Sequence, residues 1–121
     1  SMTPVIVTKD GRVVMITGSP GGRTIINTVL CVLINRLEYQ MSPRESADAP
    51  RLNMTWFPDK VTAEADMFKE HSATVERLCS MGHYIDPKPA RQGDVHSIFV
   101  EGDGRIIGVA DKRHGGGAAG Y

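Results

Sequence analysis

The stretch Gly18–Arg23, with the sequence GSPGGR, joins a strand-like segment to the long apolar run TIINTVLCVLINRL. Two adjacent glycines, Gly21 and Gly22, stand just before this run. Glycine adopts positive φ at little cost and lets the main chain approach a ligand closely. The first turn of a helix also contains amide groups that have no partner inside the helix. The stretch is therefore either a tight structural turn or a cradle of main-chain amides for negative charge.

One β-hairpin is predicted before this turn and a second one near the C-terminus. Val5–Val7 and Val13–Ile16 are apolar runs separated by Asp10–Gly11, a pair that favours a tight hairpin turn. Ser97–Val100 and Arg105–Val109 repeat the pattern. Because these strands are apolar at nearly every position, we expect both faces of their sheet to be covered.

Helices are predicted between the hairpins. Thr24–Tyr39 is apolar on almost every side, which is typical of a helix buried between layers. Ser42 and Glu45 form a capping box for a short second helix that ends at Pro50. A third helix is predicted over Ser72–Met81. Hairpins and buried helices together indicate a layered α/β (α+β) fold, which we expect to form a single domain over residues 1–121.

Composition excludes several classes of partner. The 121 residues are 40% hydrophobic and carry 14 basic and 14 acidic side chains, so we expect no nucleic-acid partner. The longest apolar run, Val29–Ile34, is far short of the ~20 residues that cross a membrane, and no secretory signal is expected in this chain. Cys31 and Cys79 are interpreted as small buried side chains, although a disulfide between them stays open.

Other candidate groups have plainer interpretations. Gly22 is followed by Arg-Thr, so the lysine of a nucleotide-binding P-loop is missing. We expect Asp111–Arg113 to be a solvated strand end and Trp56 to pack in a core or an interface. The histidines lack metal-ligand spacing, and we expect no metal and no cofactor. They are His71, His83, His96 and His114.

In their order and spacing, the motifs resemble the γ-glutamyltranspeptidase family. The matching pieces are SMTP, TGSPGG, the helix TIINTVLCVLIN, Ala49–Pro50–Arg51, Met81–Gly82–His83, Asp111 and the closing AGY. The resemblance implies part of an N-terminal-nucleophile hydrolase with an αββα sandwich, cleaved by itself into a large and a small subunit. It also implies transfer of the γ-glutamyl group of glutathione and related amides to water or an amino acid, through an N-terminal threonine.

The resemblance also assigns roles to individual residues. Gly21 and Gly22 match the pair whose main-chain amides form the oxyanion hole, a role that the physical argument for the turn also favours. Ser1 matches a serine that binds the glutamyl α-carboxylate, and Met2 beside it is interpreted as part of the pocket wall without a chemical role. A Ser-Met start can also be a remnant of tag removal, and this alternative stays open for Ser1. The substrate-binding residues implied are Ser1, Met2, Ser19 and Pro20.

The resemblance covers the C-terminal part of a small subunit and therefore only half of a site. No threonine of this chain occupies the nucleophile's position, so the chain alone is expected to be inactive. The implied partners are the rest of the small subunit, the large subunit and a small γ-glutamyl substrate, in a periplasmic or extracellular location. Two alternatives stay open: a related acylase of cephalosporin or poly-γ-glutamate type, and a non-catalytic module that retains the fold.

Overall fold

The computed structural model describes residues 3–120, which form two compact units. The sheet unit comprises the residues up to Ala49 and those from Gly93 onward, and the insert unit is Pro50–Gln92. Each unit has its own hydrophobic core. The expectation of a single domain over the whole chain stays a prediction.

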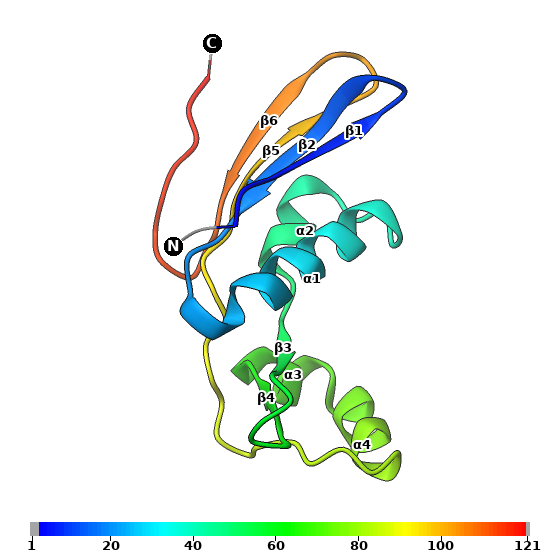
Figure 1. The fold of residues 1–121 in the computed structure, drawn as a ribbon, viewed down its shortest axis with the longest axis vertical. Coiled ribbons are helices and arrows are strands. Elements are labelled where there is room, and N and C mark those ends of the chain that lie inside the picture. Colours follow the sequence, from blue (N-terminus) through cyan, green and yellow to red (C-terminus); the bar gives the residue numbers. More distant parts are fainter. Residues whose placement is uncertain (1–2, 121) are drawn as a thin grey trace. The chain divides into compact units, whose positions relative to one another are not determined.

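Four antiparallel strands form the sheet of the sheet unit, in the order β1-β2-β5-β6 (Figure 1). β1 is Val5–Lys9 and β2 is Arg12–Gly18, joined by an Asp10–Gly11 turn with φ of 51° and 74°. β5 is His96–Val100 and β6 is Ile106–Ala110. Both predicted hairpins are confirmed, and the pairing of β2 with β5 joins them into one sheet.

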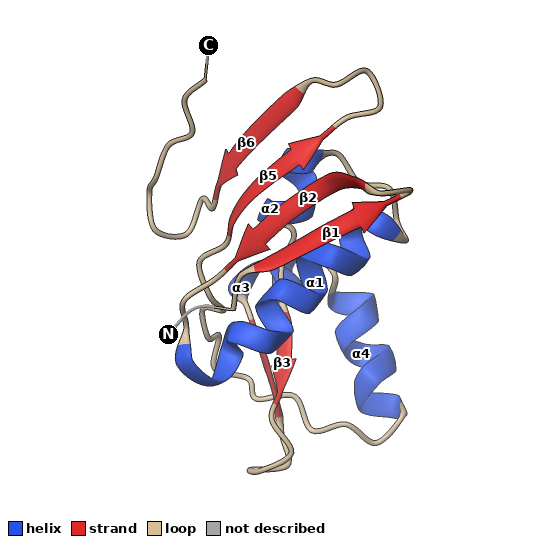
Figure 2. Ribbon diagram, turned by 45° about the horizontal axis from the view of Figure 1, so that its top comes forward, coloured by secondary structure: helices blue, strands red, loops and turns tan. Residues whose placement is uncertain are grey.

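The helix predicted after the glycine turn is confirmed, with shorter bounds. A 3-10 turn, η1 (Gly22–Thr24), leads into α1 (Ile25–Leu37). In Figure 2, α1 and α2 lie behind the four-stranded sheet, on one of its faces. The opposite side of α1 is open within residues 3–120, where Ile26 is 76% exposed and Leu30 is 48% exposed. Within this part of the chain, α1 is therefore buried on one side only and not on all sides as expected.

The predicted capping box is present at the start of α2 (Pro43–Asp48). The Glu45 amide donates to Ser42 Oγ at 3.3 Å, and the Ser42 amide donates to Glu45 Oε2 at 2.9 Å. The hydroxyl and then the main-chain amide of Ser42 lower the pKa of Glu45 through hydrogen bonds to its carboxylate. Two otherwise unsatisfied amides of the helix start are thereby bonded.

The core of the sheet unit lies between the helices and the inner face of the sheet. Strand residues alternate between faces, so Met15 and Phe99, which are partners across β2 and β5, point inward together. They pack with Val32 of α1 and Ala47 of α2, and all four are at most 1% exposed. This packing holds the helix that follows the glycine turn against the sheet.

The outer face of the same sheet is apolar and lacks a helical cover in residues 3–120. Pairing aligns Ile6, Ile16, Ile98 and Gly108 across the four strands, and we call these residues the outer row. Ile6 is 64% exposed and Ile98 is 42% exposed. The expectation that both faces are covered is thus met on the inner face only within the described residues.

The insert unit contains a hairpin and two helices. β3 (Leu52–Met54) pairs with β4 (Val61–Ala63), and α3 (Ala65–Glu70) and α4 (Ser72–Ser80) follow. The helix expected over Ser72–Met81 is confirmed as α4, whereas α3 was not expected from the sequence. The core of this unit consists of Val61, Ala63, Met67 and Ile85.

The expected burial of the two cysteines is not found, and the expectation for Trp56 is met in no core of the described residues. Cys79 is exposed and Cys31 is half-buried, and the two form no disulfide. Trp56 is 92% exposed, so it lies in no core of the described residues, and its placement in an interface stays a prediction. The residues that do face the insert core from α4 are Val75 and Leu78.

A buried polar network closes the insert unit. Arg51 is 1% exposed and its Nη1 donates to the Gln92 carbonyl at 2.7 Å. The carboxylate of Glu64 accepts the main-chain amides of Arg51 and Gln92, each at 3.0 Å. Buried charged side chains need hydrogen-bond partners, and these bonds provide partners for the Arg51 guanidinium and the Glu64 carboxylate inside the unit.

Candidate functional site

The candidate site is the turn between β2 and α1, where the main chain requires glycine. Gly21 has φ 139° and Gly22 has φ 58°, a region that other residues rarely adopt. A Cβ on Gly21 would lie 2.8 Å from Thr24 Oγ1 and 3.3 Å from Gly93 Cα. A Cβ on Gly22 would meet nothing within 4 Å, so this residue faces open space.

The amide groups of Gly21 and Gly22 donate to no other residue in the stretch 3–120. Both glycines are exposed. Their carbonyl groups, by contrast, are engaged: Gly21 O accepts the Thr24 amide at 3.2 Å, and Gly22 O accepts the Ile25 amide. The turn thus presents two adjacent main-chain donors beside the start of α1, where the helix dipole favours negative charge.

Ser19 lies on the inner side of the turn. It is 0% exposed, and its hydroxyl donates to the Pro20 carbonyl at 2.6 Å. The same oxygen accepts the main-chain amide of Asp94 at 3.0 Å. Pro20 is exposed. Substrate contacts by these two residues stay predictions, and Ser1 and Met2, the other implied substrate-binding residues, lie outside the described residues.

The segment that begins at Gly93 packs against the buried side of the glycine turn. The sequence did not indicate this contact. Gly93 has φ 62°, and a Cβ there would lie 2.4 Å from Thr28 Oγ1 and 2.9 Å from Ser19 Oγ. Thr28 belongs to α1 and is 0% exposed. Gly93 therefore lets the chain pass directly behind the turn and the first turns of α1. The only signal for this contact in the sequence is the glycine itself.

A buried ion pair follows β6. Asp111 was expected to be solvated, but it is 1% exposed and lies 3.1 Å from Arg113 Nη1. Asp111 Oδ2 accepts the Val95 amide at 2.8 Å. Arg113 also donates to the carbonyls of Ala47 and Ala49, at 3.1 Å and 2.9 Å. The expectation is wrong because the end of α2 packs against the end of β6. The carbonyls of Ala47 and Ala49 there accept hydrogen bonds from Arg113, and only the tertiary fold brings them to this position.

Metal chemistry finds no support in the described part of the chain. No three His, Cys, Asp or Glu side chains of residues 3–120 converge on one point. The four histidines are exposed. Among the same residues, no helix combines the length and apolar character needed to cross a membrane.

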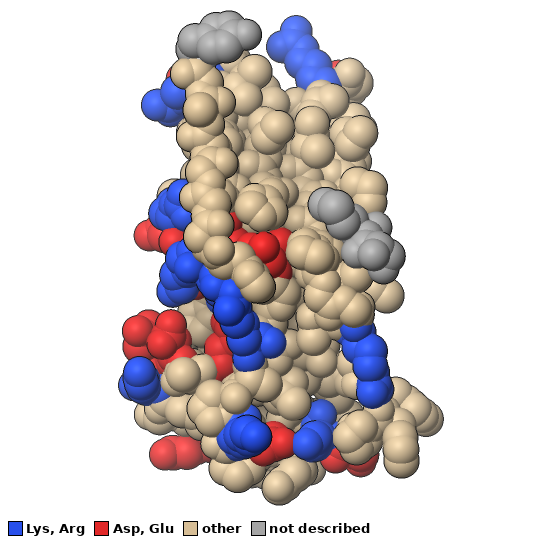
Figure 3. All heavy atoms as spheres, turned by 90° about the vertical axis from the view of Figure 1, so that its left-hand side faces the viewer, with Lys and Arg blue, Asp and Glu red and all other residues tan. Residues whose placement is uncertain are grey.

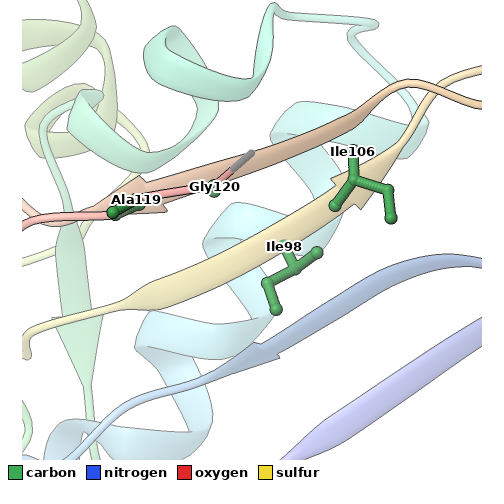
Figure 4. A pocket seen from close by; sticks show the side chains of 6 residues that line it. Ile98, Ile106, Ala119 and Gly120 are labelled. Carbon is green, nitrogen blue, oxygen red and sulfur yellow. The ribbon is translucent and has the colours of Figure 1, made fainter.

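The C-terminal tail crosses the outer face of the sheet. A Cβ on Gly108 would lie 2.7 Å from Ala118 Cβ, so the tail packs closely on β6. Beside it, Ile98, Ile106, Ala119 and Gly120 line an open groove (Figure 4). Figure 3 shows this face of the sheet as a surface with few charged side chains. The groove beside the tail is lined by apolar side chains and glycines.

Known proteins share this arrangement. A mutant of the Helicobacter pylori γ-glutamyltranspeptidase superposes with a TM-score of 0.82 at 39% identity, over 93% of this chain and 61% of that chain. A glutathione hydrolase proenzyme of Escherichia coli is 38% identical over 113 residues, which are 93% of this chain and 19% of that protein. An acylase ACY 1 proenzyme of a Pseudomonas strain is 29% identical over 116 residues, or 96% of this chain and 20% of that protein.

The fold is therefore part of the layered α/β sandwich of N-terminal-nucleophile hydrolases. The family model for γ-glutamyltranspeptidase matches residues 1–121, and the chain belongs to that family. It spans about a fifth of the length of the curated relatives it matches.

Proposed function

We propose that this chain is the C-terminal part of the small subunit of a γ-glutamyl transferase/hydrolase acting on glutathione and related amides. An N-terminal threonine outside this chain forms the acyl-enzyme. Gly21 and Gly22 provide the oxyanion hole, and Ser1 contributes to the pocket for the glutamyl α-carboxylate. The enzyme assignment is supported by the family membership over residues 1–121.

The observation that carries the oxyanion assignment is the pair of exposed glycine amides without an acceptor in residues 3–120. Acyl transfer develops negative charge on the former carbonyl oxygen, and preorganised main-chain donors stabilise that charge most. A threonine with a free amine suits the nucleophile's role, because its own amine serves as the base. The chain supplies the donors, and the nucleophile comes from the partner segment.

The apolar outer face of the four-stranded sheet supports the proposed partner. Ile6, Ile98 and Ile106 are 64%, 42% and 70% exposed, a surface that a folded protein normally covers. The proenzyme relatives are about five times longer than the segment they share with this chain. We propose that the rest of the same precursor covers this face and places the threonine in front of the glycine turn.

A second acyl specificity has an observation in its favour. The acylase relative aligns along 96% of this chain, nearly the same share as the glutathione hydrolases. The oxyanion donors serve any acyl group, because they contact the reacting oxygen and not the rest of the substrate. The side chains that distinguish a γ-glutamyl from a glutaryl group lie outside this chain.

Both proposals are tested with the full-length protein and two substrates, a γ-glutamyl anilide and a glutaryl amide. We expect turnover of the γ-glutamyl anilide; turnover of the glutaryl amide alone would remove the glutathione assignment. We expect Gly21→Ala to lower kcat by about 10²-fold, because a Cβ there displaces the donors. Gly102→Ala is the matched control, since a Cβ on Gly102 meets nothing within 4 Å. An unchanged kcat in Gly21→Ala contradicts the oxyanion assignment.

A further inference from the structure

We propose that the hydroxyl groups of Ser19 and Thr24 aim the amides of Gly21 and Gly22 by holding the carbonyl oxygens of the same peptide groups. This inference rests on the proposed function, because it assigns the two hydroxyls to the positioning of the oxyanion donors. Ser19 and Thr24 are positioning residues in this scheme and contact no substrate.

The first peptide group joins Pro20 to Gly21. A trans peptide group is planar, so its C=O and its N–H point in opposite directions. Ser19 Oγ donates to Pro20 O at 2.6 Å, and Ser19 is fully buried. The carbonyl is thereby held on the buried side of the turn, and the Gly21 amide is directed away from it.

The second peptide group joins Gly21 to Gly22 and is held in the same way. Gly21 O accepts two donors of Thr24, the main-chain amide at 3.2 Å and Oγ1 at 3.0 Å. The amide of Gly22 therefore points away from Thr24, and a Cβ on Gly22 would meet nothing within 4 Å. Two neighbouring peptide planes are fixed through their carbonyl groups while their amides stay available.

Such fixing matters because glycine is the most mobile residue in a chain. Gly21 and Gly22 can rotate through conformations closed to other residues, and each rotation would turn a donor away from the reacting oxygen. An oxyanion hole is effective when its donors need no reorganisation during the reaction. The hydroxyls remove the freedom that the two glycines introduce.

Ser19 is itself held from behind. Its Oγ accepts the Asp94 amide at 3.0 Å, which leaves the hydroxyl hydrogen directed at Pro20 O. Gly93 passes so close that a Cβ there would lie 2.9 Å from this oxygen. Two consecutive hydrogen bonds, from the Asp94 amide to Ser19 and from Ser19 to Pro20 O, therefore connect the turn to the segment before β5. Consecutive hydrogen bonds polarise and so strengthen one another.

A direct substrate contact by Ser19 fits this geometry poorly. A serine hydroxyl has one hydrogen to donate, and here it is used at Pro20 O. A carboxylate of the substrate needs donors, and the buried oxygen offers it only a lone pair. The geometry assigns Ser19 to the support of the turn.

The test compares Ser19→Ala with Ser97→Ala in the full-length protein. Ser97 is 5% exposed and its hydroxyl bonds to Thr17 Oγ1 at 2.7 Å, so its truncation removes a comparable buried bond away from the turn. We expect Ser19→Ala to lower kcat about tenfold on the γ-glutamyl anilide with KM changed less than about twofold, because the donors act in the transition state. Ser97→Ala should lower thermal stability similarly and leave kcat within about twofold of wild type.

A second pair keeps the test open if Ser19→Ala does not fold. Thr24→Val removes the hydroxyl but keeps the shape, and Thr24→Ser keeps the hydroxyl. We expect about a threefold loss of kcat in Thr24→Val, because the Thr24 amide still holds Gly21 O, and restoration of most of it in Thr24→Ser. Equal kcat in Thr24→Val and Thr24→Ser, or an unchanged kcat in Ser19→Ala, overturns the inference.

Crystal structures of the wild type and of Ser19→Ala separate this inference from the proposed function. A rotated Pro20–Gly21 peptide group in Ser19→Ala supports the aiming role whether or not the substrate is turned over. An unrotated group overturns it. A wild type that hydrolyses no γ-glutamyl substrate while the group rotates in the variant overturns the proposed function alone.

Discussion

Replacement of Gly93 by alanine tests whether the segment behind the glycine turn is as tightly packed as its geometry indicates. The new Cβ would lie 2.4 Å from Thr28 Oγ1, 2.6 Å from Thr28 Cγ2 and 2.9 Å from Ser19 Oγ. All three atoms belong to side chains that are 0% exposed, so none of them has open space to move into. The main chain must shift to accept the methyl group.

Two terms set the expected magnitude. Alanine in the left-handed region, where Gly93 has φ 62°, costs about 1–2 kcal/mol. Overpacking a filled core costs a further ~1–3 kcal/mol. The sum predicts that Gly93→Ala lowers the free energy of unfolding by about 2–5 kcal/mol. It should also lower kcat, because the displaced Ser19 holds the glycine turn.

Urea unfolding of the full-length protein, followed by circular dichroism, measures the difference. Gly104→Ala is the matched control: Gly104 also has positive φ, 86°, but a Cβ there meets nothing within 4 Å. It should show the conformational term of about 1–2 kcal/mol alone. In the double variant Gly93→Ala/Thr28→Ala, part of the loss should be recovered, because two of the three close atoms are gone. Equal destabilisation by Gly93→Ala and Gly104→Ala would refute the packing argument.

Four further changes have defined outcomes. Asp111→Asn should lower the free energy of unfolding by about 3–5 kcal/mol, because it removes the negative charge that lies 3.1 Å from the buried guanidinium of Arg113; a loss below about 1 kcal/mol in urea unfolding would contradict this. Ser42→Ala should cost about 1 kcal/mol through loss of the helix cap, measured in the same way, and wild-type stability would speak against the cap. The pKa of Glu45 is lower in the folded state than its ordinary 4.5, so its charged form stabilises the fold above pH 4.5 and this contribution disappears as the pH falls through the folded value. The stability difference between wild type and Glu45→Gln should therefore shrink below pH 4.5, and a constant difference from pH 7 to pH 3 would exclude the linkage. Ile98→Glu should reduce the yield of assembled, processed protein on a gel, because it places a charge in the outer row that the rest of the precursor is proposed to cover; an unchanged yield would contradict that cover.

Most local features were predictable because they depend on neighbours in the sequence. Asp10–Gly11 adopts the positive φ of a tight hairpin turn, and Ser42 and Glu45 form their capping box across three residues. The glycine turn before α1 was also predictable, since both glycines adopt conformations that few other residues share. The family followed from the same motifs, read in order along the chain.

Side-chain environments were less predictable. Trp56 and Cys79 are exposed although their residue types are commonly buried, and Asp111 is buried although its type is commonly exposed. In each position, burial depends on which segment packs against it. Asp111 bonds to the main chain of Val95, and its partner Arg113 bonds to the end of α2, more than sixty residues earlier in the chain.

The sequence by itself determined the two hairpins of the sheet unit, the capped start of α2, the glycine turn and the family, because each depends on local backbone preference or on motifs in fixed order. Only the tertiary structure decided how the turn is held. The bond from the Asp94 amide to Ser19 joins residues 75 positions apart, and the close passage of Gly93 behind Thr28 has no local signature. Contacts of this kind exist only after the sheet has formed and its core has packed. The glycine turn and the segment at Gly93 are far apart in the sequence, and only the folded sheet unit brings them together.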